Sequence, residues 1–389
     1  MPVTGRHYRR STMTSPILQP ILQPILQPGS GPIRSAHYLP STPDHVLWGR
    51  LPCGADDAVL TVEPGTEVTF DTISHEGILE DQGRDPRAFF AAHGQGADDV
   101  LDDAVALAAS TDATHPRTFG LDGPHVVSRP VRVSGARAGD LLAMTLVETL
   151  PRVPYGVISN RHAKGALPGE YPLGDAAIYS AFAAVVEDGV GGLPLVPGGE
   201  PVVRFPLAPF LGIMGVAVAG GQRPHSVPPG PYGGNLDINL LTVGSTLYLP
   251  VQVEGALVYV GDPHFAQGDG EVALTALEAS LRATVRLDVV AREDAVRQFG
   301  EVAGPLAATS DFLVPTGLDP DLDVAMANCV RNAIALLQAR YGMDPSLALA
   351  YLSAATDFDI SQVVDVVKGV HARIRRCDFD GVGHPRGSL

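Results

Sequence analysis

Apolar and polar residues alternate with a period of two over much of the chain before about residue 290, which is the pattern of half-buried β-strands. Residues 58–73 (AVLTVEPGTEVTFDTI) read as a hairpin-like pair of runs, and residues 130–149 read as two strands around a glycine-rich turn. The clearest alternation lies at 241–262, and one long or bent strand is expected over 272–291. The body of the protein is therefore predicted to be β-rich.

The pattern changes in the C-terminal third, where apolar residues recur with helical spacing. Residues 321–342 predict a helix that ends at Gly342, because glycine tolerates the left-handed backbone of a helix C-cap. Residues 345–354 predict a second helix with proline in its first turn, and residues 361–367 predict a third. The expected fold class is mainly β with C-terminal helices.

Proline and glycine usage suggests how the chain is divided. PILQPILQPILQP at 16–28 places a proline at every fourth position, which is incompatible with helix and with strand ladders. The predicted segments are a disordered proline-rich leader at 1–34, a β-rich N-terminal part at 35–230, a β-rich, motif-bearing catalytic part at 231–310 and a C-terminal helical part at 311–389.

Composition narrows the possible partners. The 389 residues are 45% hydrophobic and 18% charged, which is a globular balance. The net charge of −16 argues against binding to nucleic-acid phosphates, and the chain has no apolar run of the length that spans a membrane. Its three cysteines form no CxxC pair, so neither a disulfide framework nor a thiolate zinc site is expected. A reducing, cytoplasmic location fits this cysteine usage.

Candidate chemistry is concentrated in GDPHFAQGDGEVALTALE at 261–278. Asp262, His264, Asp269 and Glu271 are ligand types that zinc and similar cations prefer, although a solvated turn would also account for them. Glu278 shares the apolar face of the following strand pattern. A carboxylate on such a face is either buried with a partner or cation, or lies at a strand end in solvent.

Further candidates lie in glycine- and proline-bounded loops beside predicted strands, where sites are common. They are Asp71, His75 and Glu76 in FDTISHEG, His125 in DGPH, His225 in RPHS, and Asn235 and Asp237 in GGNLD. Each lone histidine is by default a surface or core residue. The chain has no GxSxG elbow, no phosphate-binding loop, no HExxH and no cysteine near these loops. Hydrolysis by metal-activated water is the chemistry that remains.

These residues carry a family resemblance. GGNLD at 233–237 and GSTLYLPVQVEGALVYVGDPHFAQGDGEVALTALE at 244–278 resemble the core pattern of the acetamidase/formamidase family, and the likeness extends over about residues 35–380. The resemblance implies a hydrolase that cleaves small linear carboxamides, such as formamide or acetamide, to carboxylate and ammonia. It also implies a β-sandwich-like body with an additional α+β part, a homo-oligomer (a dimer or higher), and a bound divalent cation, zinc or calcium.

The resemblance also implies residue roles. Glu278 is expected to act as the general base or as a further metal ligand, with His264 and Glu271 as further catalytic residues. Asn235, His125 and His225 are expected to bind substrate. The expected metal-site residues are Asp71, His75, Asp237, Asp262 and His264.

The chain departs from the family pattern where Pro263 and Phe265 flank His264, and Ala273–Leu274 stand where a Cys-Gly pair is common. An acidic insert at 96–123 is a candidate cap over the site. These departures leave two alternatives open. One is a hydrolase of a larger or cyclic amide, and the other is a cation-dependent binding protein that does not cleave its ligand.

Overall fold

Two large β-sheets form the body of the protein in the computed structural model, which describes residues 24–110 and 117–382. Over these residues the first sheet has nine strands. In spatial order they are β1 (His37–Leu39), β4 (Thr66–Asp71), β17 (Leu281–Val290), β7 (Leu141–Pro151), β14 (Thr246–Pro250), β18 (Leu306–Ala308), β19 (Phe312–Asp319), β21 (Lys368–Arg375) and β20 (Asp357–Gln362).

The second sheet has twelve strands over the same described ranges. Its main path runs through β11 (Pro201–Pro206), β10 (Val190–Pro194), β9 (Ile178–Glu187), β8 (Tyr155–Arg161), β16 (Leu277–Glu278), β15 (Val258–Ala266), β12 (Phe210–Val216) and β13 (Gly233–Asn235). Four short strands join it through β15: β2 (Val46–Trp48), β3 (Leu60–Val62), β5 (Val126–Ser128) and β6 (Val131–Val133).

The main hydrophobic core lies between these sheets. Phe70 of β4 and Met144 of β7 belong to the same buried cluster as Met214 of β12 and Val260 of β15. Residues from the inner faces of both sheets interdigitate there, as in β-sandwiches. The predicted mainly β, sandwich-like fold class is confirmed.

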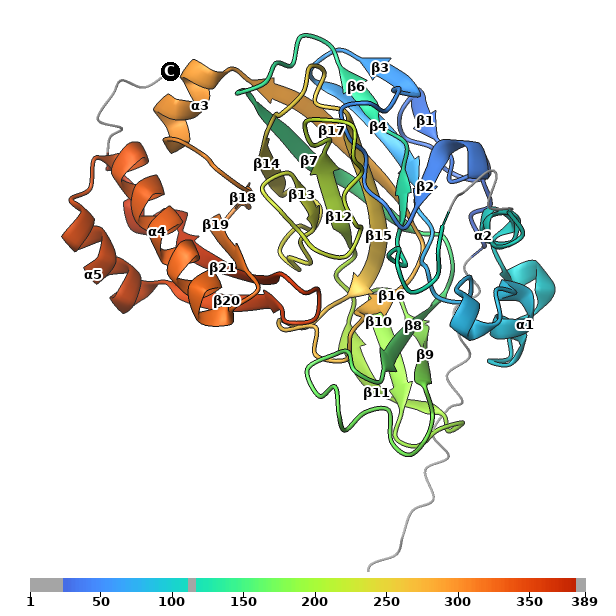
Figure 1. Cartoon of the computed structure of the whole chain (residues 1–389). Helices are drawn as coiled ribbons and strands as arrows, with labels where there is room; N and C mark the ends of the chain where they lie inside the picture. Colours follow the sequence, from blue (N-terminus) through green and yellow to red (C-terminus); the bar gives the residue numbers. More distant parts are fainter. Residues whose placement is uncertain (1–23, 111–116, 383–389) are drawn as a thin grey trace, which may run out of the picture.

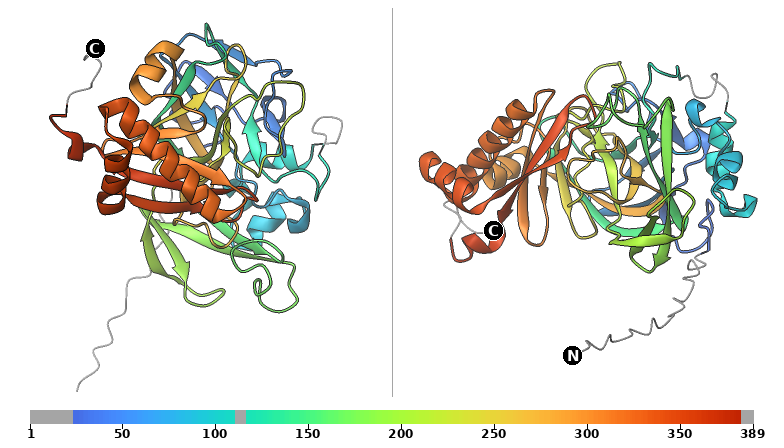
Figure 2. Two further views of the ribbon diagram at one scale, coloured as in Figure 1. Left: turned by 60° about the vertical axis from the view of Figure 1, so that its left-hand side comes forward. Right: turned by 90° about the horizontal axis from the view of Figure 1, so that it is seen from below.

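Helices lie at opposite ends of this β body (Figures 1 and 2). α1 (Pro86–Ala91) and α2 (Asp102–Ala108) lie at one end, and α3 (Arg292–Phe299), α4 (Leu322–Tyr341) and α5 (Pro345–Ala355) at the other. Gly342 ends α4 in the left-handed conformation with φ 67°, as predicted. No helix over residues 24–110 and 117–382 is long and apolar enough to cross a membrane.

The C-terminal part is α+β rather than helical alone. It contributes β19, β20 and β21 to the first sheet. The third predicted helix, at 361–367, is wrong because β20 ends at Gln362 and an irregular segment leads to β21. The segment 361–367 is too short for its pattern to distinguish a helix from a strand and its following loop.

The hairpin predicted at 58–73 is also wrong. Its two strands, β3 and β4, form but do not pair with each other: β3 pairs with β6, whereas β4 pairs with β1 and β17. The chain passes from one sheet to the other at Pro64–Gly65. Alternation reports which positions face a core, but it does not report the pairing partner.

Part of the predicted disordered leader packs against the body, whereas residues 1–23 lie outside the described residues. Leu26 is buried, and its backbone carbonyl accepts from Arg152 Nε at 2.9 Å. The Arg282 guanidinium donates to the Pro32 carbonyl at 3.0 Å. Residues 24–34 are therefore structured because their backbone satisfies two buried arginine side chains.

Candidate active site

Strand β15 supplies the centre of the site. Asp262 and His264 lie two residues apart within this strand, not in a loop after it as the glycine content of the segment suggested. Glu278 of β16 pairs across from His264 in the antiparallel ladder. The His264 Nε2 atom lies 3.1 Å from Asp262 Oδ2 and 3.1 Å from Glu278 Oε1. All three side chains are almost fully buried. The strand register places the carboxylates of Asp262 and Glu278 against the imidazole of His264.

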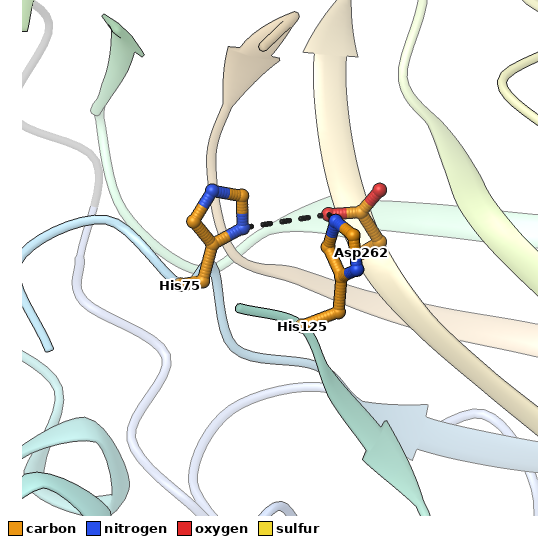
Figure 3. A group of neighbouring side chains, drawn as sticks. All are labelled: His75, His125 and Asp262. Atoms are coloured by element: carbon orange, nitrogen blue, oxygen red, sulfur yellow. Dashed lines mark ion pairs between the residues drawn. The ribbon is translucent and has the colours of Figure 1, made fainter. Parts of the chain in front are cut away.

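Two further histidines approach Asp262 from other segments (Figure 3). His75 follows β4, and its Nδ1 atom lies 3.6 Å from Asp262 Oδ1. His125 immediately precedes β5, and its Nε2 atom lies 3.8 Å from the same oxygen. The Nδ1 atom of His125 lies 3.0 Å from Ser226 Oγ, which orients the ring. One carboxylate oxygen thus faces two imidazoles.

Asp237 and Glu271 lie on another side of His264. Asp237 Oδ1 is 4.0 Å from His264 Nδ1, and both carboxylates belong to one potential ligand group with that histidine. Asp237, Asp262 and Glu271 adopt left-handed backbone conformations, with φ of 49°, 51° and 47°. Such strain in residues other than glycine is concentrated at functional sites.

Gly212 of β12 lies against this cluster, and sequence reasoning did not find it. A Cβ atom at this position would be 2.5 Å from Asp237 Oδ1, 2.6 Å from Asp262 Oδ2 and 2.7 Å from His264 Cε1. The absence of a side chain is therefore what allows these three groups to meet.

A cavity of about 530 Å³ opens onto the cluster. His75, His125, Asp262, Glu271 and Glu278 all line it. The predicted substrate-binding residues Asn235 and His225 line it as well. So do residues of the acidic insert, at 117, 119, 120, 122 and 123, which confirms that the described portion of the insert borders the site.

Burial and mutual repulsion oppose ionisation of most carboxyl groups here. Burial and the nearby Asp262 carboxylate raise the pKa of Asp237 to about 7. Burial, with the charges of Asp237 and Asp365, raises the pKa of Glu271 well above its usual value. Burial and Asp262 also raise the pKa of Glu278. Close packing of these carboxyl groups therefore favours their neutral forms unless a bound cation offsets the repulsion.

The histidines divide into two kinds. Burial alone would lower the pKa of His75, but Asp262 and Glu76 raise it to about 10. Burial lowers the pKa of His125 to about 4. Burial opposes ionisation of Glu76, yet His75 and Arg161 lower its pKa to about 2. His125 therefore offers a neutral ring nitrogen at neutral pH, which is the form that binds metals.

The donor set fits a divalent cation. Several buried side-chain atoms have no hydrogen-bond partner among the described residues: His75 Nδ1, both Asp237 oxygens, Asp262 Oδ1, both His264 ring nitrogens, Glu271 Oε2 and Glu278 Oε2. Unpaired buried polar atoms are costly, and nitrogen with carboxylate oxygen suits zinc in particular. The atoms form three overlapping potential ligand groups: His75, His125 and Asp262; Asp262, His264 and Glu278; and Asp237, His264 and Glu271.

Asp71 requires a correction, because its carboxylate is engaged elsewhere. Its Oδ1 atom accepts from Arg282 Nε at 2.6 Å, and its Oδ2 atom accepts from the Tyr38 hydroxyl. Arg152 lies 3.7 Å away. The two arginines neutralise Asp71 in the core, so we assign it a structural role instead of the expected metal-site role.

We expect Asp71→Asn to destabilise the protein by about 3–5 kcal/mol, because it leaves Arg282 buried without its counter-charge. Chemical denaturation would measure the free energy of unfolding. The matched control is Glu67→Gln, whose ion pair with Arg34 is solvent-exposed and is expected to contribute at most about 1 kcal/mol. A cost for Asp71→Asn no larger than that of the control would contradict the structural role.

Sequence reasoning missed two other residues at the cavity, Asp365 and Arg161. Asp365 is buried, and its environment raises its pKa well above the usual value through burial and Asp237. The sequence does indicate Asp365, because it is a single carboxylate among the valines of Val363–Val367. Glu278 was predicted from the same kind of pattern, a carboxylate among apolar residues. Arg161 gives no such local signal, because its partner Asp81 lies 80 residues away.

Comparison with known proteins gives a family match for part of the chain. The model of the Acetamidase/Formamidase family matches residues 217–374. A formamidase of Methylophilus methylotrophus is 26% identical over 315 residues, which cover 65% of this chain and 76% of the relative. An acetamidase of Mycolicibacterium smegmatis is 28% identical over 211 residues, 41% of this chain and 52% of the relative. The chain thus spans about half the length of that acetamidase.

The fold comparison covers more of the chain. The crystal structure of an acetamidase from Bacillus halodurans matches with a TM-score of 0.67 and 23% identity, over 89% of this chain and 99% of that one. The protein falls in the class of hydrolases that act on carbon–nitrogen bonds other than peptide bonds. Within that class, the match over residues 217–374 and the formamidase and acetamidase relatives support the Acetamidase/Formamidase family.

Proposed function

We propose that this protein hydrolyses small linear carboxamides, of the formamide or acetamide type, to a carboxylate and ammonia with the help of a divalent cation. The observation that carries the proposal is the meeting of His75, His125, Asp262 and Glu278 at the wall of one cavity. The formamidase and acetamidase relatives support the same reaction.

His75, His125 and Asp262 would hold the cation, because their ligand atoms lie within 4.8 Å of one another and all three side chains line the cavity. Binding would displace the proton that the neighbouring carboxylates favour on His75. Zinc is the ion that best matches two imidazoles and one carboxylate. When bound, the cation supplies Lewis-acid activation of water and of the amide carbonyl.

Glu278 is the proton carrier in this proposal. Its Oε1 atom faces His264, whereas its Oε2 atom has no hydrogen-bond partner over the described ranges and lies 3.9 Å from His75 Nδ1. Burial raises its pKa, which brings a carboxylate closer to the range useful for a general base. Glu278 accepts the proton of the attacking water and later transfers it to the departing nitrogen.

His264 positions the two carboxylates rather than touching the substrate, because it is fully buried behind them and is not part of the cavity lining. Its imidazole lies between Asp262 and Glu278. Burial opposes its charge, but these two carboxylates raise its pKa well above the usual value. A protonated His264 would keep both oxygens oriented toward the cavity.

The cavity also favours a second candidate substrate class. Its volume of about 530 Å³ lies in the range of pockets that hold drug-sized ligands, so an amide with a larger acyl group also fits. The site chemistry would be unchanged, and only the occupancy of the outer cavity would differ.

A panel of amides with an ammonia readout tests the proposal. We expect formamide or acetamide to release ammonia, chelator treatment to abolish the release, and added Zn²⁺ to restore it. Preference for larger amides would favour the second candidate. Saturable amide binding with no ammonia from any substrate, metal-loaded or not, would instead indicate a binding protein and reject hydrolysis.

A further inference from the structure

A second group of ligand-type side chains lies outside the lining of the cavity. Asp269, Asp359 and His371 each place one possible ligand atom within 4.8 Å of the others. Asp269 belongs to the 267–271 loop after β15, whereas Asp359 and His371 lie opposite each other on the β20–β21 hairpin. The group therefore joins two segments that are far apart in the sequence.

His371 points to a ligand independently of the two carboxylates. Its side chain is fully buried, and its Nε2 atom has no hydrogen-bond partner among residues that the structure describes. This atom lies 3.9 Å from Asp359 Oδ2. A buried ring nitrogen without a partner is costly unless something outside the chain satisfies it.

The other ring nitrogen of His371 is already engaged. Its Nδ1 atom lies 2.8 Å from Ser361 Oγ, and an N–H donated to that oxygen leaves the Nε2 lone pair directed at the carboxylates. Metal-binding histidines are oriented in this way by a partner on the second nitrogen. Burial lowers the pKa of His371 to about 4, so the ring is neutral near pH 7.

The charges of the side chains in and around this group favour a bound cation. Arg373 lies 2.7 Å from Asp359 and also 3.3 Å from Asp357, so its single positive charge is divided between two carboxylates. Among the described residues, Asp269 accepts a single hydrogen bond, from the Asn239 amide at 3.0 Å. The group therefore carries negative charge beyond what Arg373 neutralises.

We propose that Asp269, Asp359 and His371 bind a Zn²⁺ ion that fastens the 267–271 loop to the β20–β21 hairpin. One nitrogen and two carboxylate oxygens are a ligand set that zinc accepts, and Asp269 is exposed enough for water to complete the coordination. Backbone hydrogen bonds already join the two segments: Gly270 donates to Ser361, and Val363 donates to Gly270, both at 3.2 Å. The ion would reinforce this junction beside Glu271, at the edge of the cavity.

Equilibrium dialysis of the metal-stripped full chain against ZnCl₂, with bound zinc quantified, tests this site. We expect Asp269→Asn and His371→Asn each to bind one ion per chain fewer than the wild type. Asp269 is exposed, so its variant remains informative if His371→Asn folds poorly. Ser361→Ala should weaken binding at this site by about 10–100-fold, because it removes the partner that orients the ring.

Two controls separate this site from the cavity. Asp357→Asn removes a carboxylate that contacts Arg373 but belongs to no ligand group, and should bind as much zinc as the wild type. Asp262→Asn alters the cavity group and should retain the ion at Asp269. Zinc stoichiometry in Asp269→Asn and folded His371→Asn equal to that of the wild type would overturn the proposal. Because dialysis reads zinc and not ammonia, this result is independent of amide hydrolysis.

Discussion

Replacing Glu278 by glutamine should reduce ammonia release from the best amide substrate by about 10²–10⁴-fold, the usual contribution of a positioned general base. An amide cannot accept the proton of the attacking water, although it retains the size of the carboxylate. Its oxygen can still face His264 Nε2 at the 3.1 Å separation that Oε1 has now. Steady-state kinetics over a range of substrate concentrations would show the loss in kcat.

A matched control for this variant is Glu254→Gln, which makes the same chemical change at an exposed position away from the cavity. It should leave the kinetics unchanged. Circular dichroism and the thermal midpoint would establish that Glu278→Gln is folded. Turnover by folded Glu278→Gln at the wild-type rate would rule out Glu278 as the base.

Gly212→Ala should reduce activity by at least about 10²-fold, because one methyl group would force apart the groups that must meet. Its Cβ atom would lie closer than 3.0 Å to atoms of Asp237, Asp262 and His264. A misplacement of about 1 Å in a catalytic arrangement typically costs on this scale. The variant should also bind less zinc, since Asp262 belongs to the proposed ligand group.

Gly268→Ala is the control for this second variant. It adds the same methyl group near the site, but nothing lies within 4 Å of the new atom. We expect full activity and wild-type zinc content. Equal activity in the two folded variants would show that close packing against Gly212 does not set the geometry of the site.

The sequence predicted the secondary structure correctly where the pattern depends only on residues that are close together in the chain. Period-two alternation predicted a β-rich body, and helical spacing ending in glycine predicted α4 with its cap at Gly342. Pairing between strands did not follow, because β14 and β15 are close in sequence yet belong to different sheets. Periodicity identifies a buried face, but which sheet covers that face depends on contacts distant in the chain.

The same limit explains the site. Asp262, His264 and Glu278 were found because their side-chain types occur within one short block. Asp71 resembled these site residues in its local sequence pattern. Its carboxylate instead pairs with Arg282, which lies 211 residues further along the chain. Gly212 carries no chemistry of its own, so its importance appears only when its neighbours are in place.

The left-handed backbone of Asp237, Asp262 and Glu271 has a consequence for the evolution of this chain. A residue other than glycine in this conformation costs of the order of 1–3 kcal/mol, so three such residues lower the stability of the fold appreciably. Glycine at any of them would relieve the strain and remove a carboxylate in the same step. A glycine at any of these positions would therefore exchange part of the site for stability, which is the trade-off expected where activity depends on a strained site.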